Sequence, residues 1–336
     1  MSNEDSSRSS RFRTIGIVAA GAVVVGGLGV WLLTGQEGDK DSCAGLVKDK
    51  RLHQVVDAEA QKPATCAELG TAIKKATTGT SPGQHSLKQA QALKDTLLAT
   101  ADHLEKNERQ LPAGLRLPLA EALADYAGDT HVIVGTGTAE YVTNGSPSEG
   151  PWKDDSGVHV SVYKDTLLPV LRSVSEDPHA YALLRTAETR RAAESLSAIP
   201  RDAIKNNLKS APVSNARALA ALDAVADAVS DARSTEEAEK WQKAVVDTLT
   251  NKAAKAPAFK EDPVGHMVAA WATKLSATAA PQRFPYLHEE GVEMAGIWAQ
   301  AQGVDDETSA KLLSNCRKGA ETGYGTTSDD LKKLSG

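Results

Sequence analysis

This chain of 336 residues has few aromatic residues, few cysteines and no excess of positive charge. Aromatic side chains make up only 4% of the sequence, and three cysteines are too few for a fold built on disulfides. Acidic residues outnumber basic ones by 44 to 38, and the net charge of −6 argues against a generic binder of phosphate backbones. Hydrophobic residues, at 41%, are common enough for a folded core, so the sequence is not that of a disordered chain.

The sequence also lacks the short motifs of common enzyme classes. It contains no H-E-x-x-H zinc motif, no G-x-S-x-G nucleophile turn and no P-loop lysine. Ser161 and Lys164 match the S-x-x-K spacing of penicillin-binding folds, but the accompanying K-T-G and S-x-N elements are missing from suitable positions. The eight histidines show no i, i+4 spacing, so we expect them to be solvated or singly hydrogen-bonded. We therefore expect no enzymatic activity, no cofactor and no metal.

A long run without charge lies near the N-terminus. Residues 14–36 carry no charged side chain, and a helix of that length can cross the hydrocarbon core of a bilayer. Arg11 and Arg13 precede this run, and Trp31 lies near its distal end, where an indole suits the lipid headgroup level. An acidic linker follows. The positive-inside rule then predicts a plasma-membrane protein with a cytoplasmic N-terminus and an extracytoplasmic bulk.

We expect this segment to be an uncleaved signal-anchor. Its apolar stretch exceeds the usual core of a signal peptide, and no A-x-A-like cleavage site ends it. Cys43 follows Lys40, Asp41 and Ser42, which differ from the small and apolar residues that precede a lipoprotein cysteine. Small residues four positions apart within the segment offer a face for weak self-association of two such helices.

All three cysteines follow the predicted anchor, on the side of the membrane where disulfides form. Cys43 and Cys66 lie at the starts of two predicted helices, so a bridge between them would fasten the first helical hairpin. A bridge from either one to Cys316 would instead tie the C-terminal part of the chain back to the anchor. The odd count leaves one thiol over under either pairing.

Beyond the linker the pattern is helical almost throughout, with Ala, Leu, Lys, Glu and Gln dominating. Capping patterns open several helices, namely T-x-x-E at 65–68, S-x-x-E at 234–237, and Asp-Pro pairs at 177–178 and 262–263. Strand-like alternation is confined to residues 158–163, where a short hairpin with the preceding segment is an alternative. The predicted fold class is mainly α, an irregular bundle of about eleven helices behind one transmembrane helix.

These patterns divide the chain into seven parts. In order, we expect a disordered cytoplasmic tail (1–13), a transmembrane signal-anchor helix (14–36), a linker (37–42), a helical subdomain (43–134), a long loop (135–157), a second helical subdomain (158–325) and a polar tail (326–336).

The predicted loop 135–157 is the one long irregular stretch, and it is rich in Gly, Ser, Asn and Pro. Loops of this length inside folded domains are uncommon and are often functional. It holds Tyr141 and Trp152, two of the few aromatic residues, and the carboxylate pair Asp154 and Asp155, which suits a cation or a basic partner. We interpret these four residues as candidate partner contacts. The alternative is a surface loop with Trp152 folded back onto the core.

Two segments resemble parts of a known group of proteins. Residues 115–134 read LRLPLAEALADYAGDTHVIV, and residues 167–196 contain Asp177 and Pro178 as a helix cap, followed by an Ala-Tyr pair (Ala180 and Tyr181). Within a stretch of about 80 residues (115–196), they resemble helical elements of large Ala-rich actinobacterial proteins encoded near type VII secretion or polymorphic-toxin genes. This resemblance implies an actinobacterial source and a scaffold or binding role, and it supplies no site residues. The N-terminal anchor is a departure from that group.

Together these observations favour a single-pass, membrane-anchored helical protein that acts as a binding or scaffold module in the cell envelope. It would contact the lipid bilayer through residues 14–36. Its other partner would be an unknown protein or envelope component, not nucleic acid. The alternatives are an envelope enzyme such as a cell-wall hydrolase, or a membrane-side factor of a secretion, toxin or contractile-injection apparatus. A pocket with converging carboxylates or a Ser–His pair would favour the enzyme, whereas a hydrophobic patch around Trp152 would favour binding.

Overall fold

The computed structural model describes residues 43–57, 63, 65–81, 83–106, 110–201, 203, 210–251 and 255–335. The predicted transmembrane segment, with Arg11, Arg13 and Trp31, lies outside these residues. Within the described part of the chain, no helix is both long and apolar enough to cross a membrane. The described residues all belong to one compact unit, Glu37–Gly336.

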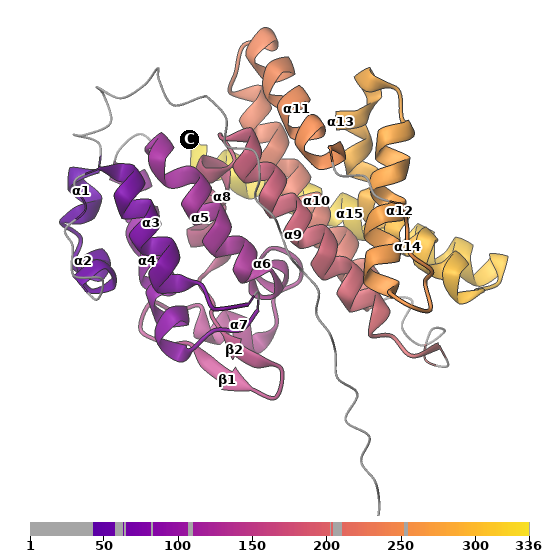
Figure 1. The fold of residues 1–336 in the computed structure, drawn as a ribbon, viewed down its shortest axis with the longest axis horizontal. Coiled ribbons are helices and arrows are strands. Elements are labelled where there is room, and N and C mark those ends of the chain that lie inside the picture. The colour runs from indigo at the N-terminus through magenta and orange to yellow at the C-terminus, as the bar shows by residue number, and fades with distance from the viewer. Residues whose placement is uncertain are drawn as a thin grey trace, which may run out of the picture. The chain divides into compact units, whose positions relative to one another are not determined.

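This part of the protein is mainly helical, as the sequence predicts (Figure 1). A single two-stranded antiparallel hairpin is the one sheet among the described residues. The N-terminal elements are α1 (Ala44–Val47), α2 (Lys50–Asp57), α3 (Cys66–Thr77), α4 (Leu87–Lys106), α5 (Ala113–Asp125), α6 (Ala127–Val134), α7 (Ala139–Asn144), β1 (Trp152–Asp154), β2 (Gly157–His159) and α8 (Lys164–Val174). The C-terminal elements are α9 (Pro178–Ser197), α10 (Ala211–Asp231), α11 (Thr235–Thr250), α12 (Pro263–Ala277), η2 (Ala280–Gln282), α13 (Arg283–Tyr286), η3 (Leu287–Glu289), α14 (Glu290–Gln302) and α15 (Asp306–Ser335).

Local sequence determines where several of these helices begin and end. Thr65 and Ser234 each accept a hydrogen bond from the backbone N–H three residues further on. Asp177 and Asp262 cap helices whose first residue is proline. Gly303 ends α14 in the left-handed conformation, with φ of 65°, which glycine adopts without a steric cost. The predicted caps are therefore confirmed, because each depends on residues that are neighbours in the sequence.

Two hydrophobic clusters form the core, and they divide within α9. Leu184 belongs to the first cluster, with α3, α4, α5 and α8, whereas Tyr181 belongs to the second, with α11, α12 and α14. This division does not coincide with the predicted break between two helical subdomains at 135–157. That boundary is displaced because α8 buries Leu168 and Leu171 against α4 and α5. The two clusters meet along α9 and α10, which contribute residues to both, rather than at a loop.

The C-terminal residues differ from the polar tail that was expected at 326–336. α15 continues through them because its inner face is buried, with Thr327 at 0% and Leu331 at 3% exposure. Lys164 of α8 forms an ion pair with Asp330 at 3.1 Å, and α15 packs along α10 for much of its length. Tertiary packing therefore stabilises a helix that the polar composition alone did not indicate.

The segment 135–157 also differs from expectation, since it contains α7 and the first strand of the hairpin. The Thr138 hydroxyl caps the start of α7. At the other end, the ammonium group of Lys94, which is fully buried on α4, donates to the carbonyl oxygens of Asn144 at 2.6 Å and Ser146 at 2.7 Å. A cation at the C-terminal end of a helix satisfies carbonyl groups that would otherwise lack partners. This buried lysine holds α7 against the helical body.

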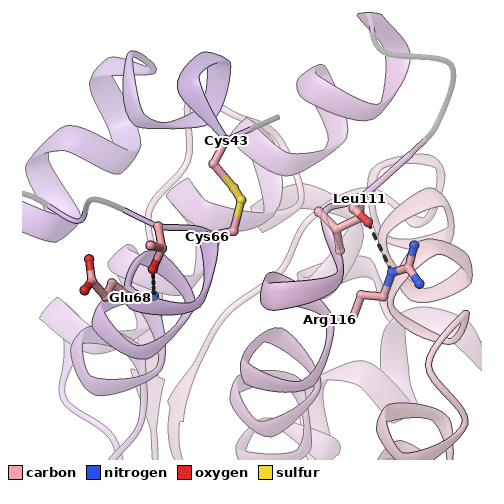
Figure 2. The surroundings of a disulfide bond; sticks show 6 residues. Cys43, Cys66, Glu68, Leu111 and Arg116 are labelled. Carbon is pink, nitrogen blue, oxygen red and sulfur yellow. Dashed lines mark hydrogen bonds between the residues drawn. A yellow bond between two sulfur atoms is a disulfide. The ribbon is translucent and has the colours of Figure 1, made fainter. Parts of the chain in front are cut away.

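Cys43 and Cys66 form a disulfide, which confirms the first of the two predicted pairings (Figure 2). The bond joins the residue before α1 to the first residue of α3. Nearby, Arg116 donates from Nε to the carbonyl oxygen of Leu111 at 3.1 Å, which fastens the turn that leads into α5. Cys316 is a free, buried thiol, so a bridge through it is wrong.

Candidate functional site

Polar and aromatic side chains gather where the hairpin meets α6 and α7. β1 and β2 pair in antiparallel register, which places Trp152 opposite His159. Asp154 closes the turn by accepting hydrogen bonds from the backbone N–H groups of Ser156 at 2.7 Å and Gly157 at 3.3 Å. Gly157 has φ of 144°, a conformation that residues with a side chain rarely adopt. We name the cluster formed by Asp129, Tyr141, Trp152, Asp154 and His159 the hairpin site.

Asp129 on α6 joins the three elements of the hairpin site. It is 4% exposed, and its Oδ1 accepts hydrogen bonds from the Tyr141 hydroxyl at 2.6 Å and from His159 Nδ1 at 2.8 Å. Its Oδ2 accepts from the backbone N–H of Val160 at 3.1 Å. One buried carboxylate therefore takes three donors from α7 and the hairpin, which satisfies its charge away from water.

His159 lies between two carboxylates. Its Nδ1 contacts Asp129, and its Nε2 lies 3.1 Å from Asp154 Oδ1. The hydrogen bond to Asp129 raises the pKa of His159 against the opposing effect of burial. Hydrogen bonds from Ser156 lower the pKa of the exposed Asp154 carboxyl to about 2. Burial, followed by the nearby Asp129 charge, raises the pKa of Tyr141. The two carboxylates thus stabilise the protonated form of the imidazole relative to the neutral form.

The aromatic rings of the hairpin site contact one another. Tyr141 and Trp152 meet edge to face with centroids 4.9 Å apart, and the Trp152 and His159 rings lie 5.4 Å apart. Such ring pairs add stability beyond the area they bury. The indole N–H of Trp152 is buried without a hydrogen-bond partner among the described residues. Trp152 thus packs against its neighbours, but its polar group is left unsatisfied.

Two of the large apolar side chains that remain exposed lie next to this cluster. Val142 follows Tyr141 on α7 and is 60% exposed, and Tyr163, just before α8, is 46% exposed. A Cβ on Gly145, after α7, would lie 3.0 Å from the Tyr163 ring, so the ring covers the end of that helix. Each of Val142 and Tyr163 therefore leaves an apolar side chain exposed on a segment that flanks the charged hairpin. Such mixed surfaces are typical of contact sites between proteins.

Ser156 and His159 form the Ser–His pair that would favour an enzyme, with Asp129 behind the imidazole as in a catalytic triad. Three features oppose nucleophilic catalysis. Ser156 donates its hydroxyl proton to Asp154 at 2.6 Å, and the carboxylate partners of His159 raise its pKa, which disfavours the neutral imidazole that a general base requires. The backbone N–H groups of Ser156 and Gly157 bind Asp154 rather than pointing at a place for an oxyanion. These contacts do not arrange Ser156 as a nucleophile.

The structure brings together three of the four residues predicted as partner contacts. Tyr141, Trp152 and Asp154 lie in the hairpin site, whereas Asp155 is exposed in the turn and forms no hydrogen bond or ion pair within the described residues. Sequence reasoning missed Asp129 and His159. They are 30 positions apart, and neither lies in a recognisable motif, so no sequence signal marks them as a pair.

The chain matches no protein-family model, and neither curated proteins nor solved structures show a match to it. The resemblance of residues 115–134 and 167–196 to Ala-rich actinobacterial proteins therefore stays a prediction. In the structure the first segment forms most of α5 and all of α6, and the second spans much of α8 and nearly all of α9.

Proposed function

We propose that this chain is a single-pass, membrane-anchored protein whose extracytoplasmic helical body binds another macromolecule of the cell envelope through the hairpin site. The observation that carries the proposal is the hairpin site itself, in which contacting aromatic rings and the exposed side chains of Val142 and Tyr163 lie near a charged turn. Several aromatic residues of this chain are buried in the second hydrophobic cluster, whereas Tyr141 and Trp152 belong to neither cluster. Aromatic side chains also contribute disproportionately to the energy of protein interfaces.

Two features support the location. Residues 14–36 carry no charge, arginines precede them and acidic residues follow, which is the pattern of a signal-anchor with its N-terminus in the cytoplasm. The Cys43–Cys66 disulfide lies soon after that run, and disulfides persist in oxidising compartments outside the cytoplasm. Both features are explained if the chain leaves the cytoplasm at its anchor.

A crosslinking experiment on intact cells tests location and binding together. Val142→Cys places a thiol beside the hairpin site, on a side chain that is 60% exposed. A membrane-impermeant maleimide that carries a photoreactive group should label this variant in intact cells. Illumination should then give an adduct of one defined mass, because a bound partner lies within reach of residue 142.

Two matched variants serve as controls. Leu117→Cys, on α5 and 41% exposed, should be labelled equally well but should give no adduct. Ser9→Cys, in the predicted cytoplasmic tail, should be labelled only after the cells are permeabilised. Labelling of Val142→Cys only in permeabilised cells would contradict the location. Labelling without an adduct, or with the same adduct at residue 117, would contradict binding at the hairpin site.

A further inference from the structure

A second group of charged side chains is buried between α9, α10 and α14. Arg185 donates from Nε to Glu290 Oε2 at 2.6 Å and from Nη1 to Asp223 Oδ1. The three side chains are 1%, 0% and 2% exposed, respectively. A single buried cation therefore faces two buried carboxylates. Such an imbalance is costly in a protein interior unless another cation or a proton compensates for it.

The two carboxylates differ in how fully they are hydrogen-bonded. Glu290 uses both oxygens, because Thr189 donates its hydroxyl to Oε1 while Arg185 binds Oε2. Asp223 uses only Oδ1, and no donor within the described part of the chain reaches its Oδ2. Nη2 of Arg185 is taken by the carbonyl oxygen of Leu287 at 2.7 Å. The unmatched negative charge is therefore concentrated on Asp223.

Asp223 lines a cavity of about 250 Å³ between α10, α14 and α15. The lining includes the apolar side chains of Ala220, Val292 and Ala320, while Tyr324 and the exposed Glu321 also line it. This volume suits a small ligand, since pockets for larger organic molecules start at about 300 Å³. A buried carboxylate with a free oxygen thus opens onto a space whose walls are partly aliphatic.

The nearest histidine does not supply the missing cation directly. His288 also lines the cavity, but its Nε2 pairs with Asp227 Oδ1 at 3.7 Å, and the Tyr324 hydroxyl donates to Asp227 Oδ2 at 2.7 Å. His288 thus pairs with Asp227, and it acts on Asp223 only through its charge, without a hydrogen bond to it among the described residues. Arg317 lines the same cavity from the exposed face of α15 and forms no ion pair within the described residues. Oδ2 of Asp223 therefore still lacks a hydrogen-bond donor among the described residues.

We propose that this cavity binds a primary alkylammonium group, with the ammonium on Asp223 Oδ2 and the alkyl chain against Ala220, Val292 and Ala320. An ammonium group is compact, carries three donors and supplies the one positive charge that the buried cluster lacks. The aliphatic walls favour a ligand with an alkyl chain over a bare inorganic cation. No cluster of metal-ligating side chains occurs among the described residues, which fits an organic cation. The ligand is either a free amine or a lysine side chain of a partner.

Calorimetric titration of the full-length chain tests this site, with the protein in a non-ionic detergent and a phosphate buffer free of primary amines. The probe is butylammonium chloride, and the matched control is 1-butanol, which has the same alkyl chain without the charge. We expect the ammonium to bind and the alcohol to bind at least about tenfold more weakly, since a charged hydrogen bond to a carboxylate is lost. Equal affinity for both probes, or no heat of binding with the ammonium, would overturn the proposal. If the ammonium gave no heat of binding, a proton on Asp223 would be what balances the negative charge of the buried cluster.

Variants of the cluster give the sharper comparison. Asp223→Asn should abolish binding of butylammonium, whereas Glu290→Gln, which removes the same charge from a carboxylate that does not line the cavity, should leave it. Ala320→Leu fills the cavity without changing a residue of the buried ion pairs, and it should also abolish binding. This second variant tests the site even if Asp223→Asn fails to fold. Unchanged binding by the folded Asp223→Asn or Ala320→Leu variant would refute the site.

A second titration distinguishes the two sources of the ligand. Nα-acetyl-lysine amide carries the same ammonium on a chain attached to a peptide-like backbone, and its Nε-acetylated form serves as the uncharged control. Binding of the lysine derivative would identify a lysine side chain as a ligand that fits. Binding of butylammonium alone would assign the cavity to free amines. This site is independent of the hairpin site, so the failure of either proposal leaves the other in place.

Discussion

His159 depends on contacts that join residues distant in the sequence. Its ring nitrogens lie 2.8 Å from Asp129 and 3.1 Å from Asp154, so one imidazole connects α6 to the hairpin turn. The prediction of a solvated or singly hydrogen-bonded side chain is wrong for this residue. A histidine that gains carboxylate partners on folding has a raised pKa in the folded state, so the stability of the fold depends on pH.

We expect the free energy of unfolding to fall as the pH rises through the raised pKa of His159. The pair stabilises the fold fully below the ordinary histidine pKa of about 6.5, where the unfolded chain is also protonated. Its contribution, about 1 kcal/mol, is lost above the raised value, because the imidazole then gives up its proton. Urea denaturation of His159→Gln across this range should therefore show a smaller loss of stability with rising pH than the unchanged chain.

His179→Gln is the matched control for that measurement. His179 is exposed, and within the described residues its ring makes one hydrogen bond, to the uncharged Thr248 hydroxyl at 3.1 Å, so its removal should leave the pH dependence unchanged. His288, whose pKa is raised chiefly by its pairing with Asp227, adds a slope of the same sign to every variant. Parallel curves for His159→Gln and the unchanged chain would contradict the ion-pair interpretation.

At the scale of elements, the packing of α15 along α10 depends on glycine. A Cβ placed on Gly323 would lie 2.2 Å from the backbone carbonyl oxygen of Arg217, whereas a Cβ on Gly325, two residues on, would meet nothing within 4 Å. Glycines are normally unfavourable inside a helix. Gly323 is therefore present because the two helix backbones approach closely, and the same reason does not apply to Gly325.

We expect opposite effects when these two glycines are replaced by alanine. Gly323→Ala should lower the free energy of unfolding by roughly 2 kcal/mol, because the methyl group forces the two helices apart. Gly325→Ala should raise it by about 0.5–1 kcal/mol through helix propensity alone. Chemical denaturation of both variants measures the difference. Equal effects of either sign would show that α15 does not pack on α10 in this way.

At the scale of the whole molecule, the buried arginine lies where the two hydrophobic clusters meet. Arg185 extends from α9 to Asp223 on α10, Glu290 on α14 and the carbonyl oxygen of Leu287 in η3. α9 itself contributes to both clusters. The charged network therefore ties the helices of the second cluster to a helix that is shared with the first.

Arg185→Met should destabilise the protein by about 3–5 kcal/mol, because two buried carboxylates then lose their cation. Arg190→Met, on the same helix with a side chain that is 70% exposed, should change the stability by less than about 0.5 kcal/mol. Urea denaturation followed by circular dichroism compares the two variants. Similar stabilities would mean that the Arg185 network contributes little to the fold.

Residues that act on their neighbours in the chain could be predicted, whereas those that act across the fold could not. The helix starts at Thr65, Ser234, Asp177 and Asp262 follow from side chains that cap the next few N–H groups. α7 was missed because its stability comes partly from Lys94, a residue 50 positions away from Asn144. The continuation of α15 beyond residue 325 was missed for the same reason, because Asp330 pairs with the distant Lys164 of α8.

The candidate site shows the same division. Tyr141, Trp152 and Asp154 were predicted as partner contacts because a long irregular segment with aromatic residues is unusual. Asp129, the carboxylate that gathers them, lies inside an ordinary helix and has no distinguishing neighbours. Its role depends on a buried position between α7 and the hairpin, which only the packing of those elements creates.

The sequence by itself determined the helical class, the ends of many helices and the uncharged run at residues 14–36, since each depends on residues within a few positions of one another. Only the tertiary structure decided that Cys66 pairs with Cys43 rather than Cys316, that His159 meets Asp129, and that Asp223 opens onto a cavity. The physical reason is that helix formation is governed by local hydrogen bonds and side-chain periodicity. Contacts between distant residues are selected by how the completed helices pack, which no short stretch of sequence encodes.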